Sequence, residues 1–174
     1  MVEKAFTQAT IARTEAVNSS QFTPASNSLL ASYESGNLTE QLIGDTIFGF
    51  VERIASSQPD HEIFVSTWQN KRFTYSQFVK EVDCLAKGLI SLGVRRGDRV
   101  AIWSTNNIEW FVVFLAVSKL GAILVNVNPG LRTHELEYVL NQSGTKVLFS
   151  IVRYRTSEYL SMLAELMPSM FGQK

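Results

Sequence analysis

Residues 98–129, DRVAIWSTNNIEWFVVFLAVSKLGAILVNVNP, decide the fold of this chain. Residues 98–103 and 122–127 are short apolar runs rich in strand-forming side chains, and turn-forming residues follow each of them. Between them, residues 108–120 contain an unbroken apolar block, Trp110 to Val117, and Gly121 follows as a helix terminator. The pattern predicts a strand, a buried helix and a second strand. Two strands that are apolar on both faces and joined by a helix form a parallel pair, which needs cover on both faces.

The residues before this unit predict a helix, a hairpin and a second helix. Asp45 or Thr46 can cap a helix that runs to about residue 56, with residues 47, 50, 51 and 54 on its apolar side. Residues 62–68 and 72–75 are strand-like and flank the polar turn 69–71. Thr74 and Gln77 form a capping box for a helix over residues 76–92, whose pattern is that of an amphipathic surface helix.

The residues after the unit continue the alternation of helices and strands. Thr133 can cap a helix that runs to residue 142, residues 146–150 form a third apolar strand, and a last helix spans about 157–167 before Pro168. This order predicts an α/β fold, with a layered, mainly parallel sheet flanked by helices. Residues 45–168 form the predicted domain. Residues 1–44, with 17 Ser, Thr, Asn or Gln, are expected to be a polar, poorly ordered arm, and residues 169–174 a tail.

Composition and charge exclude several classes of protein. Apolar residues make up 45% of the chain, which is typical of a globular protein. Sixteen basic residues balance sixteen acidic ones, so charge gives no argument for a nucleic-acid partner. The single cysteine, Cys84, excludes an internal disulfide and is expected to be a small buried side chain. The longest apolar run, Trp110 to Val117, is far shorter than the roughly 20 residues that cross a bilayer, so no transmembrane segment is predicted.

Polar residues follow each predicted parallel strand and are the candidate ligand-binding positions. They are Ser104 to Asn107, Asn126 to Pro129, and Ser150. In open parallel sheets, ligands bind beyond the carboxyl ends of the strands, and Asn106 or Asn107 could hydrogen-bond a ligand there. The alternative is that these side chains cap helices and form turns, which are the usual roles of Asn and Ser.

No constellation of catalytic or metal-binding residues is evident in the sequence. It contains neither GxGxxG nor GxxxxGK[ST], the two glycine-rich phosphate-binding motifs. Six isolated ionisable residues have simpler explanations, as turn, loop or helix-surface positions: His61, Arg95, Arg96, His134, Glu135 and Glu137. A phosphate contact remains the alternative for the two arginines. The sequence therefore predicts no catalytic, cofactor-binding or metal-ligating residue within these 174 positions.

Four motifs in order nonetheless resemble a known family. They are Phe73–Thr74–Tyr75, Gly97–Asp98–Arg99–Val100, Lys119–Leu120–Gly121–Ala122 with Val127–Asn128–Pro129, and Glu135 to Leu140. Together, over about residues 45–165, they resemble the N-terminal part of AMP-forming acyl-CoA synthetases in the adenylate-forming superfamily. The segments VNVNP and ELEYVL look most similar to the medium-chain acyl-CoA synthetase family member 2 branch. The resemblance identifies the domain as an incomplete N-terminal part of the large domain of such an enzyme.

The resemblance implies a ligase of fatty-acid metabolism. A fatty acid or other small carboxylic acid reacts with ATP to give an acyl-adenylate, and coenzyme A then takes the acyl group, with Mg²⁺ supporting the chemistry. The family's phosphate loop, its adenine and ribose contacts and its mobile-domain lysine all lie downstream of the matching segment. We therefore expect these 174 residues alone to be inactive and to bind none of ATP, Mg²⁺ or CoA. The branch implies a mitochondrial location, with the cytoplasm as the alternative.

A second hypothesis is a non-catalytic interaction module. An incomplete sheet exposes apolar surface, which favours association with a full-length relative or with a second copy. A third, a free-standing flavodoxin-like nucleotide binder, is disfavoured by the missing phosphate loop. We also expect the helix around Trp110 to Val117 to be the most buried element.

Overall fold

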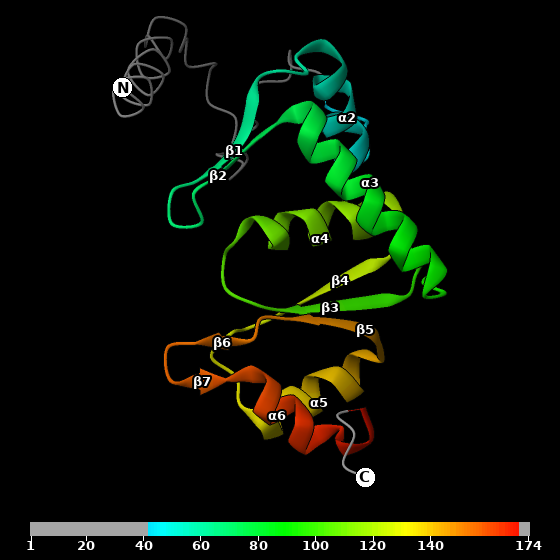
Figure 1. The fold of residues 1–174 in the computed structure, drawn as a ribbon. Helices are drawn as coiled ribbons and strands as arrows, with labels where there is room; N and C mark the ends of the chain where they lie inside the picture. Colours follow the sequence, from blue (N-terminus) through cyan, green and yellow to red (C-terminus); the bar gives the residue numbers. More distant parts are fainter. Residues whose placement is uncertain (1–41, 171–174) are drawn as a thin grey trace, which may run out of the picture. The chain divides into compact units, whose positions relative to one another are not determined.

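A three-stranded parallel sheet is the centre of the fold in the computed structural model, which describes residues 42–170 (Figure 1). The strands are β3 (Arg99–Trp103), β4 (Ile123–Val127) and β5 (Thr145–Ser150), in the spatial order β4-β3-β5. Ala101 lies opposite Val125 on one side and Leu148 on the other, and both pairings are parallel. The expectation of an α/β fold with a parallel sheet is confirmed.

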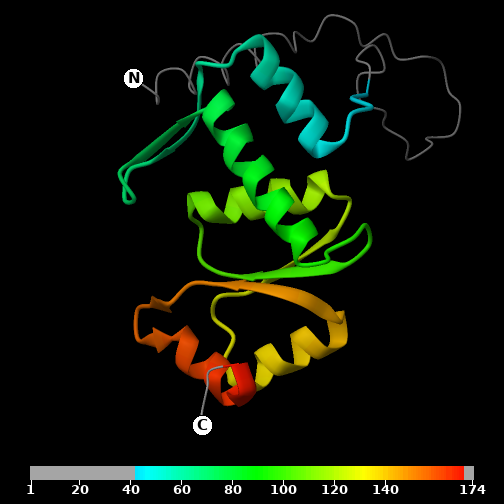
Figure 2. The same cartoon turned by 45° about the vertical axis from the view of Figure 1, so that its right-hand side comes forward.

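Helices cover both faces of this sheet, as Figures 1 and 2 show. On one side lies α4 (Ile108–Lys119), with α3 (Tyr75–Ser91) and α2 (Ile47–Ser57) beyond it and the hairpin of β1 (Glu62–Ser66) and β2 (Lys71–Thr74) beside them. On the other side lie α5 (Thr133–Ser143), α6 (Tyr159–Leu166) and the short 3₁₀ helix η1 (Pro168–Met170). A small hairpin, β6 (Arg153–Tyr154) with β7 (Ser157–Glu158), precedes α6.

The sheet separates two apolar cores. The α4-side core contains buried residues of β3, α3 and α4 and one from α2, including Phe78, Val100 and Ala116. The α6-side core is smaller and is built around Trp103 and Tyr159, whose ring centroids lie 4.1 Å apart. Successive β3 residues face opposite sides of the sheet, so this one strand contributes to both cores.

Local hydrogen bonds explain where three of the helices begin. The Thr46 side chain accepts from the backbone N–H of Gly49 at the start of α2. Thr74 and Gln77 form the expected capping box of α3, with the Thr74 N–H donating to the Gln77 side chain at 3.0 Å. Asn107 caps α4. The predicted caps at these three positions are confirmed.

Five expectations about individual elements are wrong. β3 is more completely buried than the helix around Trp110, with four of its five residues buried, although α4 has the most buried residues of any helix in the range 42–170. Cys84 is exposed, because the buried stripe of α3 passes through its neighbours Val82 and Ala86. In α2, Phe48 rather than Ile47 is buried.

The fourth and fifth concern the last two helices. Arg132, not Thr133, is the N-cap residue of α5, and its backbone N–H donates to the Glu135 side chain at 3.0 Å. The last helix begins at Tyr159, because residues 157 and 158 pair with β6 instead. Of the predicted arm and tail, residues 1–41 and 171–174 lie outside the described range. No helix within residues 42–170 is long and apolar enough to span a membrane.

Candidate functional site at the carboxyl ends of the parallel strands

The chain leaves neighbouring strands toward opposite faces of the sheet, and this creates the candidate site. β3 leads into α4 on one face, whereas β5 leads toward α6 on the other. A hollow of about 330 Å³ lies between the ends of these strands, bordered by Ser104, Asn107, Phe149 and Ser150 among others. A neighbouring hollow of about 600 Å³ is lined by Trp68, Thr105, Asn106, Asn107, Pro129, Ile151, Arg153 and Tyr154. Such a switch point is where open α/β sheets bind ligands.

Asn107 uses both ends of its amide to hold the start of α4. Its Oδ1 accepts from the Trp110 N–H at 2.7 Å, and its Nδ2 donates to Ser104 Oγ at 3.0 Å. Ser104 Oγ in turn donates to the Thr105 carbonyl at 2.8 Å. The capping interpretation of these two residues therefore holds, while Asn106 is exposed and borders the larger hollow.

Asn126, within β4, and Asn128, directly after β4, also have structural roles. Asn128 Oδ1 accepts from the Gly130 N–H at 2.8 Å, which closes a turn after β4. Asn126 Oδ1 accepts from the Trp110 indole at 3.2 Å, so it links β4 to α4. At the end of β5, Ser150 Oγ donates to the Ile151 carbonyl at 2.9 Å.

The tip of the β1–β2 hairpin is fastened to the same end of the sheet. Gln69 Oε1 accepts from the Ile108 N–H at 3.0 Å, and Gln69 Nε2 donates to Glu109 Oε2 at 2.7 Å. Lys71 Nζ donates to Glu109 Oε1 at 2.5 Å. Partial desolvation opposes ionisation of Glu109, but the hydrogen bonds from Lys71 and Gln69 outweigh it and lower the pKa of this carboxyl. Trp68 at the hairpin tip, 70% exposed, thereby becomes one wall of the larger hollow.

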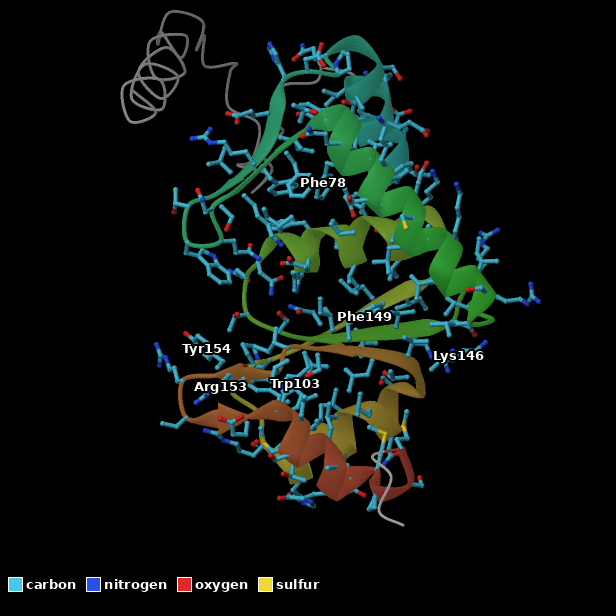
Figure 3. The ribbon with its side chains drawn as sticks, in the orientation of Figure 1. Phe78, Trp103, Lys146, Phe149, Arg153 and Tyr154 are labelled. Carbon is cyan, nitrogen blue, oxygen red and sulfur yellow. The ribbon has the colours of Figure 1, made fainter. Side chains whose placement is uncertain are left out.

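The opposite wall of this hollow comes from β6. Arg153 and Tyr154 lie at the end of β5 that is far from Lys146, as Figure 3 shows. Arg153 Nε lies 3.2 Å from Glu158 Oε1, and the Arg155 guanidinium lies 5.2 Å from the centre of the Tyr154 ring. These residues could not be predicted from the sequence, because strands of two residues have no period to detect. The hollow is lined by two aromatic side chains, Trp68 and Tyr154, and by one cationic side chain, Arg153.

The remaining candidate residues lie elsewhere. Arg95 and Arg96 are exposed in the turn before β3, where the Arg95 N–H donates to Asp98 Oδ2 at 2.7 Å. Lys146 Nζ also donates to Asp98 Oδ2, at 2.9 Å. His61 and His134 are both exposed. Within residues 42–170, no three His, Cys, Asp or Glu side chains gather as a metal site would require.

Comparison with known proteins identifies the family. A profile described as "AMP-binding enzyme" matches residues 51–170, which is more than half of the chain. This chain belongs to the AMP-binding enzyme family. The expectation of a resemblance to the N-terminal part of such enzymes is confirmed, since the matching solved structures include a fatty acyl CoA synthetase and the N-terminal domain of FACL13, both from Mycobacterium tuberculosis.

Three individual proteins show the extent of the similarity. The mitochondrial medium-chain acyl-CoA ligase ACSF2 of Mus musculus is 35% identical over 139 residues, which cover 80% of this chain and 23% of the ligase. The Bacillus subtilis protein YngI, provisionally named an acyl-CoA synthetase, is 39% identical over 130 residues. These residues cover 75% of this chain and 24% of the length of YngI. The N-terminal domain of FACL13 from Mycobacterium tuberculosis superposes with a TM-score of 0.61 at 27% identity, covering 74% of this chain and 30% of that domain.

This chain spans about a quarter of the length of the curated relatives it matches. Residues 42–170 contain no cluster of acidic side chains that could hold Mg²⁺, and the sequence contains no glycine-rich phosphate loop for a nucleoside triphosphate.

Proposed function

We propose that these 174 residues serve as the N-terminal scaffold of an AMP-forming, medium-chain acyl-CoA ligase and have no ligase activity by themselves. The single observation that carries the proposal is that the polar side chains at the strand ends form hydrogen bonds within the fold itself. Asn107, Asn126 and Asn128 all hold backbone or side-chain groups of the fold itself. These residues shape the entry into α4 and the turn after β4, and the acid, ATP and CoA belong to the complete enzyme.

The medium-chain substrate and the mitochondrial location rest on the relatives' names. Mitochondrial medium-chain ligases from several vertebrates match at 31–36% identity, and the bacterial YngI matches at 39%. Fluorescence microscopy of the tagged chain against a mitochondrial marker tests the location. A diffuse cytoplasmic signal would contradict it.

A chimeric ligase tests the scaffold function. Residues 51–170 would replace the matching quarter of the Mus musculus ligase, and ATP–pyrophosphate exchange would be measured with an eight-carbon acid. We expect acid-dependent exchange from the chimera, because the scaffold supplies the same sheet and helices. The Phe78→Ala chimera is the matched control, since loss of a buried α3 ring should remove both folding and exchange. A soluble, folded chimera without exchange would contradict the proposal.

The second candidate function is the non-catalytic interaction module. One observation favours it: β5 is an edge strand whose residues all keep some exposure, next to an apolar groove. Both candidates predict that the isolated chain has no ligase activity. The second differs because it also predicts that the isolated chain associates with a full-length relative or with a second copy.

A further inference from the structure

The β1–β2 hairpin is held at two separate places. At its base, the ring centroids of Phe64 and Phe73 lie 4.7 Å and 6.2 Å from that of Phe78, against the α4-side core. At its tip, none of residues 65–72 is buried, and Trp68 is 70% exposed. Figure 2 shows the hairpin standing out from the helices. Apolar packing therefore fixes the base, whereas the tip is fastened by polar contacts.

These polar contacts meet at the first turn of α4. Gln69 accepts from the Ile108 N–H and donates to Glu109, and Lys71 pairs with the same carboxylate across 2.5 Å. These contacts of Gln69 and Lys71 with Ile108 and Glu109 form the hairpin latch. The side chains of Lys71 and Glu109 are 47% and 54% exposed, so water competes for the ion pair and the pair holds the tip weakly.

The hairpin can tilt at its base without losing its own pairing. Its register shifts just before Phe64, which is where a strand pair bends most easily. Beyond that point, residues 64–66 pair with residues 71–73, and the Asn70 N–H donates to the Thr67 carbonyl at 3.3 Å. A tilt of about 15° over a lever of four residues, roughly 13 Å long, moves the tip by about 3 Å. Such a movement is enough to break the hydrogen bonds of the latch.

One polar group favours a second position of the hairpin. The Ser66 hydroxyl is buried and has no hydrogen-bond partner within residues 42–170. A buried hydroxyl without a partner destabilises the arrangement that buries it, because it has given up its hydrogen bonds to water. A tilt that admits water to this hydroxyl therefore offsets part of the loss of the exposed latch contacts.

We propose that the β1–β2 hairpin is a hinged flap with two positions and that the hairpin latch holds it closed. In the closed position, Trp68 forms one wall of the hollow of about 600 Å³ at the strand ends. In the open position, Trp68 leaves the hollow and the Ile108 N–H loses its acceptor. The flap thereby controls access to the crevice from this side. The inference concerns groups within residues 62–111 and does not depend on ligase activity.

Hydrogen exchange measured at single amides of the purified 174-residue chain tests the latch. Lys71→Met removes its cation and leaves Gln69, the acceptor of the Ile108 N–H, unchanged. We expect the Ile108 amide to exchange about two- to fivefold faster, the effect of losing an exposed ion pair. The Trp110 amide, which Asn107 holds, and the paired amides of residues 64–66 should keep their rates.

The matched control is Lys80→Met, which is exposed on α3 outside the latch and should change none of these rates. An unchanged rate at Ile108 in Lys71→Met would overturn the proposal, because the latch would then not hold the tip. Equal acceleration at Ile108 and in the hairpin ladder would also overturn it, since the hairpin would then unfold rather than tilt.

Fluorine NMR of the chain labelled with 5-fluorotryptophan tests the two positions. The chain has three tryptophans, and Trp68→Phe identifies the signal of Trp68. We expect relaxation dispersion from exchange at Trp68 and a shift of its signal toward the open position in Lys71→Met, with a single unaffected signal from the buried Trp103. A Trp68 signal without exchange, and unchanged in Lys71→Met, would contradict a flap with two positions.

The chimeric ligase tests the flap in the presence of the rest of the enzyme. The Ile108 amide should respond to Lys71→Met in the chimera as it does in the 174-residue chain, whether or not the chimera is active. No response of this amide in the chimera would overturn the proposal for the complete ligase. Pyrophosphate exchange is measured separately, so failure of the flap and failure of the scaffold function are distinguishable.

Discussion

The two faces of the sheet are completed to different degrees. On the α4 side, Phe64 lies with its ring centroid 4.7 Å from that of Phe78 and 4.5 Å from that of Phe111, so a hairpin and two helices close a continuous aromatic core. On the α6 side, a smaller core depends on Trp103 and Tyr159, and an open groove remains beside β5. Within residues 42–170, the α4-side core is therefore the larger and more continuous one, whereas the α6 side keeps an apolar groove beside β5.

The largest expected effect comes from the α4 side. Phe78 is fully buried, so Phe78→Ala should lower the free energy of unfolding by about 3–5 kcal/mol. Urea denaturation followed by circular dichroism measures it, at one fixed protein concentration. Trp68→Ala, at the exposed hairpin tip, is the control and should change stability by less than about 0.5 kcal/mol. Equal effects of the two changes would show that the aromatic core is not formed in solution.

Loss of the α4 cap should have the next largest effect. Asn107→Ala removes the acceptor for the Trp110 N–H and the donor to Ser104, which should cost about 0.5–2 kcal/mol. The neighbouring exposed Asn106→Ala is the matched control. Thermal unfolding of the two variants compares them directly. If Asn106→Ala were the more damaging change, the assignment of the cap would be wrong.

On the α6 side, the Tyr159 hydroxyl provides a smaller test. It donates to the Pro129 carbonyl at 2.6 Å, and burial raises the pKa of this hydroxyl above its ordinary 10.0, so the proton that makes the bond is present at neutral pH and in mild alkali. Tyr159→Phe should cost about 0.5–1.5 kcal/mol. Tyr154→Phe, on the exposed hairpin, should cost nothing measurable by urea denaturation. An unchanged free energy of unfolding in Tyr159→Phe would mean that this bond does not anchor α6.

The smallest effect depends on pH. The hydrogen bond from Lys146 and that from the Arg95 N–H lower the pKa of Asp98 from its ordinary 3.8. Because the pKa is lower in the folded state, this stabilisation is present above pH 3.8 and is lost as the pH falls through the folded value. The stability difference between the unchanged chain and Lys146→Met should therefore shrink below about pH 4. Lys80→Met, exposed on α3, is the control; a difference that grew in acid would contradict the sign.

The sequence predicts the α4 side best. The apolar block Trp110 to Val117 has no polar face, and a helix without one has to be covered on all sides. Strands β3, β4 and β5 follow from the same reasoning, since parallel strands are apolar on both faces. These signals are local and strong, so both the elements and their parallel pairing could be predicted.

Other features depend on contacts between residues far apart in the sequence. Gln69 and Lys71 reach Glu109 across about forty positions, and no local pattern indicates such a contact. The β6–β7 hairpin is too short for a period to appear, so the last helix was predicted two residues early. Cys84 was expected inside because its residue type is usually buried, whereas its position on α3 faces outward.

An assay of the isolated chain tests the central claim most directly. Pyrophosphate release would be measured from the purified 174 residues with ATP, Mg²⁺, CoA and an eight-carbon acid. We predict no acid-dependent release above the buffer rate, because the strand-end asparagines hold the fold and the described residues gather no metal-binding cluster. Release that requires the acid, and that disappears in the Asn106→Ala variant, would contradict the account and place chemistry in the crevice at the strand ends.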